Sequence, residues 1–274
     1  MSSGIVVRIG RSRQTVTGVI AVLLFAGIAL FAPELAPQSP TSQNLSEDLR
    51  GPRAGHLFGT DKLGRDVLSR VIYGARVSLV VGVSVVGISA TLGLLIGALA
   101  GYAGGAVDEL LMRAIDILLA FPGILLAIAL SAVLGPSLRN VLLALCVSGW
   151  TGYARLVRGE VLAWREREFV SAAVALGARP LRVVARHIVP QLLSPLFVQA
   201  TFGMAGAIVA EASLSFLGLG VQPPTPSWGT MVNEGRSFLL VAPHVAVFPG
   251  LALMLVVLSL NLLGEGLRDT LDVR

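Results

Sequence analysis

The chain has 274 residues, of which 54% are hydrophobic and only 14% are charged, and its mean hydropathy is +0.80. A soluble globular domain of this length does not need so much apolar surface, so the composition predicts a membrane protein surrounded by a lipid bilayer. The net charge of +5 comes from 20 Arg and one Lys, Lys62. These residues flank apolar stretches as orientation signals do, which argues against nucleic acid as a partner.

Six apolar segments are each long enough to cross the roughly 30 Å hydrocarbon core of a bilayer. A helix satisfies its own backbone hydrogen bonds in lipid, so all six are expected to be helical. The sequence therefore predicts an all-α, polytopic membrane protein with six transmembrane helices, forming one domain over 16–274 behind a tail at 1–15. The predicted spans are 16–33, 77–101, 113–134, 140–158, 196–218 and 244–263.

The distribution of Arg predicts how these spans are oriented. The N-terminal tail carries three Arg, and the region around the loop predicted at 159–195 carries seven. With six spans both regions fall on one side, which the positive-inside rule makes cytoplasmic, so both termini are expected there. The loops at 34–76 and 219–243 are then external. The Arg residues concerned are Arg8, Arg11, Arg13, Arg155, Arg158, Arg165, Arg167, Arg179, Arg182 and Arg186.

The second predicted span carries a stripe of small residues. Gly93, Gly97 and Gly101 repeat every fourth residue, and such a stripe lets another helix approach closely. The approaching helix could belong to the same chain or to a partner subunit. Packing within the chain is the simpler interpretation.

The third predicted span begins with opposite charges and contains a proline. Arg113 and Asp116 are three residues apart, so we expect them to pair near the cytoplasmic interface. Pro122 follows within the same span and is expected to kink the helix. Such a kink would either serve as a gating hinge or only suit the packing.

The fifth predicted span contains a carboxylate, Glu211. An unpaired carboxylate is costly inside a membrane, so two interpretations arise. Glu211 either hydrogen-bonds to Ser213, Ser215 or a neighbouring helix, or it lines a translocation pathway near the external mouth.

The polar, Arg-rich segment at 168–190 interrupts the apolar pattern. Small side chains on a short helix let the surface of a partner approach the backbone, and a following Gly lets the chain leave the helix. The sequence therefore predicts a cytoplasmic knob that fits a socket on another protein. The small and turn-forming residues are Ser171, Ala172, Ala173, Ala175, Gly177 and Pro190.

This segment resembles the coupling segment, or EAA loop, of permease subunits in ATP-binding-cassette importers. Ala172, Ala173, Gly177 and Pro190 stand at matching positions, whereas Ser171 replaces the usual Glu. Glu168 lies one turn earlier. The resemblance implies contact with an ATPase subunit through Glu168, Ser171, Ala172, Ala173, Gly177, Ala178 and Pro190.

Four further stretches are similar to the dipeptide, oligopeptide and nickel permeases, in their second or C-type subunit: 56–70, 214–224, 226–229 and 261–269. The resemblance implies a type I importer permease fold with a cytoplasmic coupling helix, in a bacterial cytoplasmic membrane. It also implies a homologous B-type permease, two ATPase subunits and an external solute-binding protein as partners. Peptides are the expected substrate, and nickel, haem or another small solute is the alternative.

The sequence contains no recognisable catalytic arrangement. The 59–64 stretch has the glycine spacing of a phosphate loop, but Arg65 and Asp66 follow where Lys and Ser or Thr are required, so we expect no ATP hydrolysis by this chain. His56, His187 and His244 lack the spacing of metal ligands, and no cofactor is expected. An ion-driven secondary transporter or a membrane scaffold are the other classes. A secondary transporter would need more ionisable groups at mid-membrane.

Overall fold

The computed structural model describes residues 13–271, so Arg8, Arg11 and most of the predicted tail lie outside the described part. Within this range the regular structure is helical, with two isolated β-bridges and no strand, as the predicted all-α class requires. Short 3-10 or π turns lie at Leu45–Glu47, Val184–Ile188 and Arg236–Phe238. The α-helices are α2 Arg13–Leu30, α3 Ala32–Leu35, α4 Val67–Ala103, α5 Gly105–Leu119, α6 Gly123–Leu134, α7 Leu138–Arg165, α8 Glu168–Ala175, α9 Pro180–Val183, α10 Val189–Phe216, α11 Trp228–Gly235 and α12 His244–Leu271.

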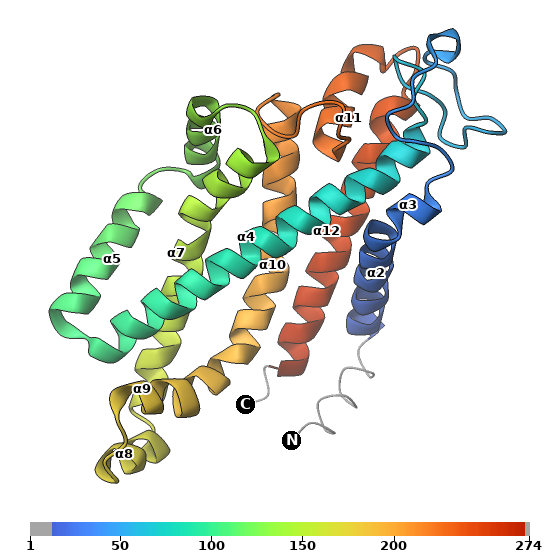
Figure 1. Ribbon diagram of the computed structural model, residues 1–274. Helices are drawn as coiled ribbons and strands as arrows, with labels where there is room; N and C mark the ends of the chain where they lie inside the picture. Colours follow the sequence, from blue (N-terminus) through green and yellow to red (C-terminus); the bar gives the residue numbers. More distant parts are fainter. Residues whose placement is uncertain (1–12, 272–274) are drawn as a thin grey trace.

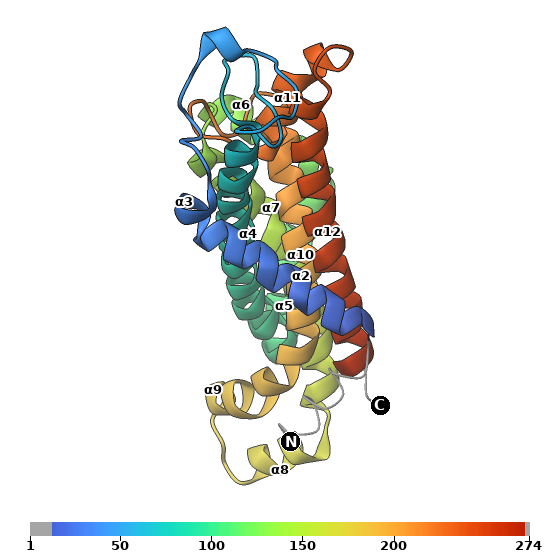
Figure 2. The same ribbon diagram turned by 90° about the vertical axis from the view of Figure 1, so that its right-hand side faces the viewer.

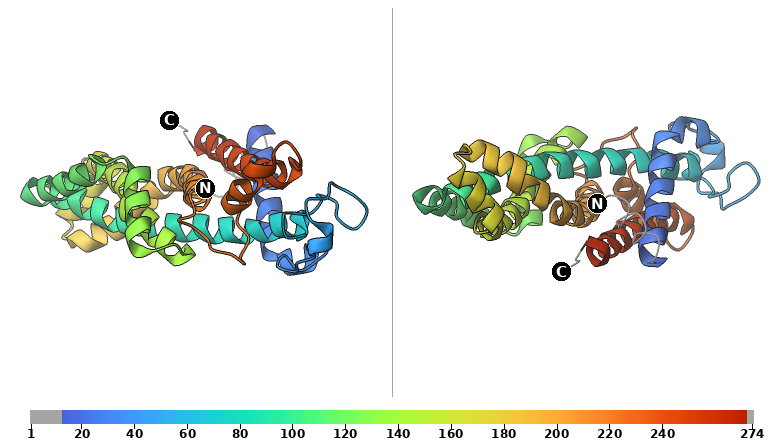
Figure 3. Two further views of the ribbon diagram at one scale, coloured as in Figure 1. Left: turned by 90° about the horizontal axis from the view of Figure 1, so that it is seen from above. Right: turned by 90° about the horizontal axis from the view of Figure 1, so that it is seen from below.

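The long helices run along the length of an elongated molecule (Figure 1). One end carries α8 and α9, and the start of α2 and the end of α12 both lie toward it (Figure 2). The opposite end carries the 36–66 loop, α6 and α11. We call these the α8–α9 end and the loop end. Viewed from above and below, α5 and α7 lie on one side, α2 and α12 lie on the other, and α4 crosses between them (Figure 3).

Three described helices are long and apolar enough to cross a membrane, namely Val67–Ala103, Pro180–Phe216 and His244–Thr270. The pair of α5 and α6 adds a fourth candidate span with a sharp bend. α2 is a shorter apolar helix, and α7 is long but carries several Arg in its second half. The structure therefore shows a helical membrane chain with three to four candidate spans. The count of six is a proposal that adds α2 and α7.

The second predicted span begins earlier than the hydropathy of the sequence indicated. α4 starts at Val67 rather than near residue 77, so its first turns occupy the end of the predicted 34–76 loop. Asp66 caps the helix by accepting a hydrogen bond from the Ser69 N–H at 2.7 Å. The other predicted loops also contain helices, because α8 and α9 lie within 159–195 and α11 lies within 219–243.

Pro122 breaks the third predicted span instead of kinking it. α5 ends at Leu119, α6 starts at Gly123, and the two helices are bent by 77° relative to each other. Proline lacks an N–H and its ring clashes with the preceding turn, so it is tolerated at a helix start rather than in a helix interior. Pro122 accordingly occupies the N-cap position of α6.

The predicted pair of Arg113 with Asp116 is wrong. Arg113 instead reaches back one turn to Glu109, at 2.6 Å, and Asp116 pairs with Arg155 of α7. Glu109 precedes Arg113 by four residues, which is the favourable order for a carboxylate and a cation on one helix. Asp116 is drawn to a cation on the neighbouring helix, so α5 is tied to α7 at this point.

The glycine stripe of α4 packs against α7 of the same chain. A Cβ atom added to Gly93 would lie 2.3 Å from the Cβ of Tyr153, and one added to Gly97 would lie 2.4 Å from the carbonyl oxygen of Ala154. At Gly101 the corresponding distance to the carbonyl oxygen of Arg158 is 2.9 Å. These distances are too short for any side chain, so the glycines let the two backbones touch.

We predict that Gly93→Ala destabilises the protein by about 1–3 kcal/mol, because the added methyl group overpacks the α4–α7 contact. Gly87→Ala is the matched control on the same helix, since a Cβ there meets nothing within 4 Å. Gly87→Ala should be neutral or stabilising by about 0.4–1 kcal/mol. Thermal unfolding of both purified variants in detergent measures the difference. Equal midpoints would contradict the close contact.

Candidate functional site

The segment between α7 and α10 forms a projection at the α8–α9 end (Figure 2). The chain leaves α8 at Gly177, whose φ of +83° disfavours other residues. The Gly177 N–H donates to the carbonyl oxygen of Val174 at 2.9 Å, and the Ala178 N–H donates to that of Ala173 at 3.1 Å. This pair of bonds is the Schellman motif, which satisfies the free carbonyls at the end of a helix. Ala173 and Ala178 therefore stabilise the turn through their backbone hydrogen bond, and both residues are half-buried.

The other residues expected at a partner contact are exposed, namely Glu168, Ser171, Ala172, Gly177 and Pro190. Pro190 belongs to the first turn of α10 rather than to the projection. Apolar side chains accompany the exposed residues of α8 and its turn. The most exposed is Leu176, at 89%, and Leu181 and Val174 are exposed as well. Exposed apolar side chains gathered on one projection indicate a surface that a partner covers.

The opposite face of the projection is fixed to the helices. Val170 of α8, Val183 of α9 and Ile188 are buried against Val157 and Val161 of α7. Phe169 of α8 contacts the ring of Trp164 at the end of α7, with ring centroids 6.2 Å apart. The projection and α7 therefore form one packed unit.

Charged side chains connect α7 in turn to α4 and α5. Arg158 donates two hydrogen bonds to the carboxylate of Asp108, at 3.0 and 2.6 Å. Arg165, in the last turn of α7, donates to the carbonyl oxygens of Gly101 and Tyr102 at the end of α4, both at 3.3 Å. Together with the pair of Arg155 and Asp116, these contacts join α7 to both of its neighbours.

Glu211 is held beneath the connection between α10 and α11. Its side chain is 1% exposed, and its Oε1 accepts a hydrogen bond from Ser215 Oγ at 2.6 Å. The same hydroxyl accepts from the Val221 N–H at 3.1 Å, so the carboxylate fixes the chain after α10. The hydroxyl of Ser213 binds the carbonyl oxygen of Val209 instead. One carboxylate oxygen is therefore bonded within its own helix, whereas Oε2 is buried and has no hydrogen bond among residues 13–271.

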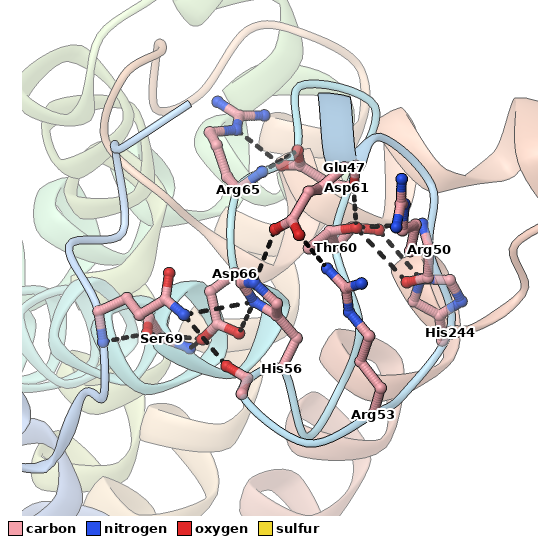
Figure 4. Close-up of polar contacts among 12 residues, drawn as sticks. Glu47, Arg50, Arg53, His56, Thr60, Asp61, Arg65, Asp66, Ser69 and His244 are labelled. Carbon is pink, nitrogen blue, oxygen red and sulfur yellow. Dashed lines mark hydrogen bonds and ion pairs between the residues drawn. The ribbon is translucent and has the colours of Figure 1, made fainter. Parts of the chain in front are cut away.

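A buried cluster of charges that was not predicted from the sequence holds the loop end together, and Figure 4 shows two of its members, Asp61 and Arg65. Asp61 accepts from Arg65 Nε at 2.6 Å and from Arg70 Nη1 at 2.7 Å. Both guanidinium groups also reach Glu234 of α11, at 3.0 and 3.2 Å. Asp61, Arg65 and Arg70 are buried, so two cations and two carboxylates join the 36–66 loop, α4 and α11.

The glycine-spaced stretch at 59–64 folds around this cluster. The N–H groups of Leu63 and Arg65 donate to Asp61 Oδ1, at 2.8 and 3.0 Å. Gly59 and Gly64 both have positive φ, of 74° and 67°. The backbone donors that would cradle a phosphate in a phosphate loop are therefore directed at a carboxylate of the chain itself.

A second polar group lies beside the cluster (Figure 4). The two ring nitrogens of His56 face Asp66 Oδ1 at 3.0 Å and Glu47 Oε2 at 3.2 Å. Glu47 also pairs with Arg53 at 2.7 Å, and the hydrogen bond from this Arg holds the pKa of the Glu47 carboxyl below its usual range. His244, at the start of α12, contacts the carbonyl oxygen of Thr60 at 3.0 Å. The loop is thus fixed to α4 and to α12.

Comparison with known proteins agrees with this architecture. The family described as binding-protein-dependent transport system inner membrane component matches residues 93–274. The dipeptide transport system permease protein DppC of Alkalihalophilus pseudofirmus is 47% identical over 262 residues, covering 96% of this chain and 86% of that protein. The glutathione transport system permease protein GsiD of Escherichia coli is 47% identical over 266 residues, covering 97% of this chain and 88% of that protein.

The chain therefore belongs to the family of inner membrane components of binding-protein-dependent transport systems. It is a permease subunit, the membrane-embedded part of an importer. Membership of this family implies, in general terms, an ATPase and a solute-binding protein as partners.

We predict that Asp61→Asn destabilises the protein by roughly 3–5 kcal/mol, because it leaves two buried guanidinium groups with one carboxylate between them. Glu109→Gln is the matched control, since it breaks an exposed pair with Arg113 that contributes at most about 1 kcal/mol. Denaturant or thermal unfolding of both purified variants provides the measurement. A loss of stability in Asp61→Asn that is no larger than the loss in Glu109→Gln would contradict the role assigned to the buried cluster.

Proposed function

We propose that this chain is one of two permeases in an importer of small peptides and that ATP hydrolysis in partner subunits drives the transport. Two relatives with the same 47% identity are named for dipeptide and glutathione transport, which favours a peptide-type solute over nickel or haem. The second permease would be a homologous B-type subunit. Uptake of a labelled dipeptide by vesicles containing both permeases, the ATPases and the binding protein tests the proposal.

The observation that carries the coupling role is the two-sided character of the projection. One face of α8 and α9 is packed onto α7, and the other exposes small residues and Leu176. We infer that an ATPase subunit covers the exposed face. Small residues such as Ala172 let its surface approach the backbone of α8.

The contacts of α7 suggest how such docking would act on the membrane helices. When the ATPases close on ATP, the projection would be displaced together with α7. The ion pairs of α7 with α5, and its close contact with α4, would pass this displacement to the spans. The projection would then act as a lever whose rigidity comes from packed valines and the Schellman turn.

The distribution of charge supports a cytoplasmic α8–α9 end. Among the described residues, none of four Arg around the projection makes an ion pair: Arg167, Arg179, Arg182 and Arg186. At the loop end, by contrast, Arg53, Arg65 and Arg70 are neutralised by carboxylates. An excess of Lys and Arg in the short segments next to the spans marks the cytoplasmic side of a membrane protein, and seven Arg lie in or beside this projection. The loop end would then face outward and receive the solute-binding protein.

An ion-driven secondary transporter is the second class of function. It would need ionisable groups at mid-membrane, and Glu211 is the residue in question. One oxygen of its carboxylate accepts a hydrogen bond from Ser215 beneath the connection to α11, which favours a structural role over ion coupling.

We predict that Leu176→Ala weakens the binding of the ATPase subunits by roughly 1.5–3 kcal/mol, because it removes an apolar side chain that the contact would bury. Leu240→Ala is the matched control, since Leu240 is equally apolar and 101% exposed but lies at the loop end. Co-purification of the ATPases with each variant, at equal permease yield, gives the comparison. Equal recovery in both variants would exclude Leu176 from the docking surface.

We predict that a Cys at position 179 reacts with a membrane-impermeant reagent only after cells are opened, whereas a Cys at position 57 reacts in intact cells. Arg179 lies in the projection and Leu57 is exposed at the loop end. Both substitutions are made in a Cys146→Ala background, because Cys146 is the only native Cys. Labelling of position 179 from outside would reverse the proposed orientation.

A further inference from the structure

A cavity of about 250 Å³, lined mostly by apolar and small residues with a few polar groups among them, lies between α4, α6, α7 and α10, where the third span is broken. Gly123 and Ile124, the first residues of α6, form part of its wall. The opposite walls come from the middle of α4, α7 and α10. The cavity therefore lies beside the middle of these three long helices, where the start of α6 meets them.

The wall of this cavity contains a buried hydroxyl with no hydrogen bond. Ser89 of α4 is 1% exposed, and its Oγ has no hydrogen-bond partner within residues 13–271. The thiol of Cys146 lies beside it, but a thiol is only a weak hydrogen-bonding group. Burying a polar group without a hydrogen-bond partner costs free energy, so we expect Ser89 to hydrogen-bond to a ligand that enters the cavity.

The start of α6 presents further donors to the same space. The N–H groups of Gly123 and Ile124 donate to no other group in the described part of the chain, because the break at Pro122 removes the preceding turn. A helix N-terminus also carries a partial positive charge. Ser148 lies close by, since a Cβ added to Gly123 would be 3.7 Å from its Oγ.

The remaining polar lining is neutral. Tyr153 donates only a long bond, of 3.4 Å, to the carbonyl oxygen of Gln199, and no Asp, Glu, Lys, Arg or His lines the cavity. Hydroxyl and N–H donors around a helix N-terminus suit a carboxylate. The lack of a cation keeps such binding weak, as a transit site requires, because the solute must also leave.

We propose that this cavity binds the carboxylate of the peptide while it crosses the membrane. The inference rests on the proposed peptide importer and adds the place in this subunit where the solute is held. Ser89, Ser148 and the N–H groups of Gly123 and Ile124 are the donors.

The first test uses two substitutions that differ by one charge. Ser148→Asn keeps a polar side chain in the cavity, whereas Ser148→Asp adds a negative charge that repels a carboxylate. Dipeptide uptake is measured with the assembled transporter in vesicles at saturating binding protein. We expect Ser148→Asp to lower the uptake rate about tenfold or more relative to Ser148→Asn. Equal rates in the two variants overturn the proposal.

The second test removes a single oxygen and does not depend on tolerance of a charge. Ser89→Ala should lower uptake several-fold. Ser78→Ala should leave it unchanged, although Ser78 is also on α4, 1% exposed and without a hydrogen-bond partner among residues 13–271, because it does not line the cavity. Equal uptake by these two variants also overturns the proposal. If the wild-type complex takes up no dipeptide at all, the peptide importer itself is rejected.

Discussion

The contact between the backbones of α4 and α7 is the constraint on which the rest of the structure depends. Gly93, Gly97 and Gly101 remove every side chain from one stripe of α4, so α7 lies directly against it. That contact fixes the direction of α7 relative to α4. It thereby sets where α8 projects at one end of the molecule and where the cavity opens midway along it.

The two ends of the molecule are stabilised by different physical means. At the loop end, Asp61 and Glu234 neutralise Arg65 and Arg70 away from water, which makes the 36–66 loop part of the helical body. At the α8–α9 end, packing among valines holds the projection, and the Arg residues stay in solvent. A buried charge cluster is stable only in the geometry that pairs its charges, whereas an exposed apolar surface can be covered by a partner.

The sequence predicts the helices well because an apolar run is local information. The turn at Gly177 is equally local, since a glycine after small helical residues indicates an αL cap. The start of α4 was placed too late because Arg70 has the polarity of a loop residue, and its neutralising partner Glu234 lies 164 residues away in the chain. The predicted pairing of Arg113 with Asp116 was wrong for a related reason, since Asp116 pairs with Arg155 on α7. The buried cluster could have been predicted from the alternating acidic and basic residues Asp61, Arg65, Asp66 and Arg70.

The break at Pro122 also constrains how the chain enters the membrane during synthesis. With 15 and 12 residues, α5 and α6 reach only about 22 and 18 Å, each short of a bilayer core of roughly 30 Å. Neither helix is a stable insertion unit by itself, and the unpaired backbone groups between them cannot face lipid. We therefore expect the two helices to enter the membrane as one bent unit that is shielded by α4 and α7. These two helices are consequently stable in the membrane only when they pack against neighbouring helices.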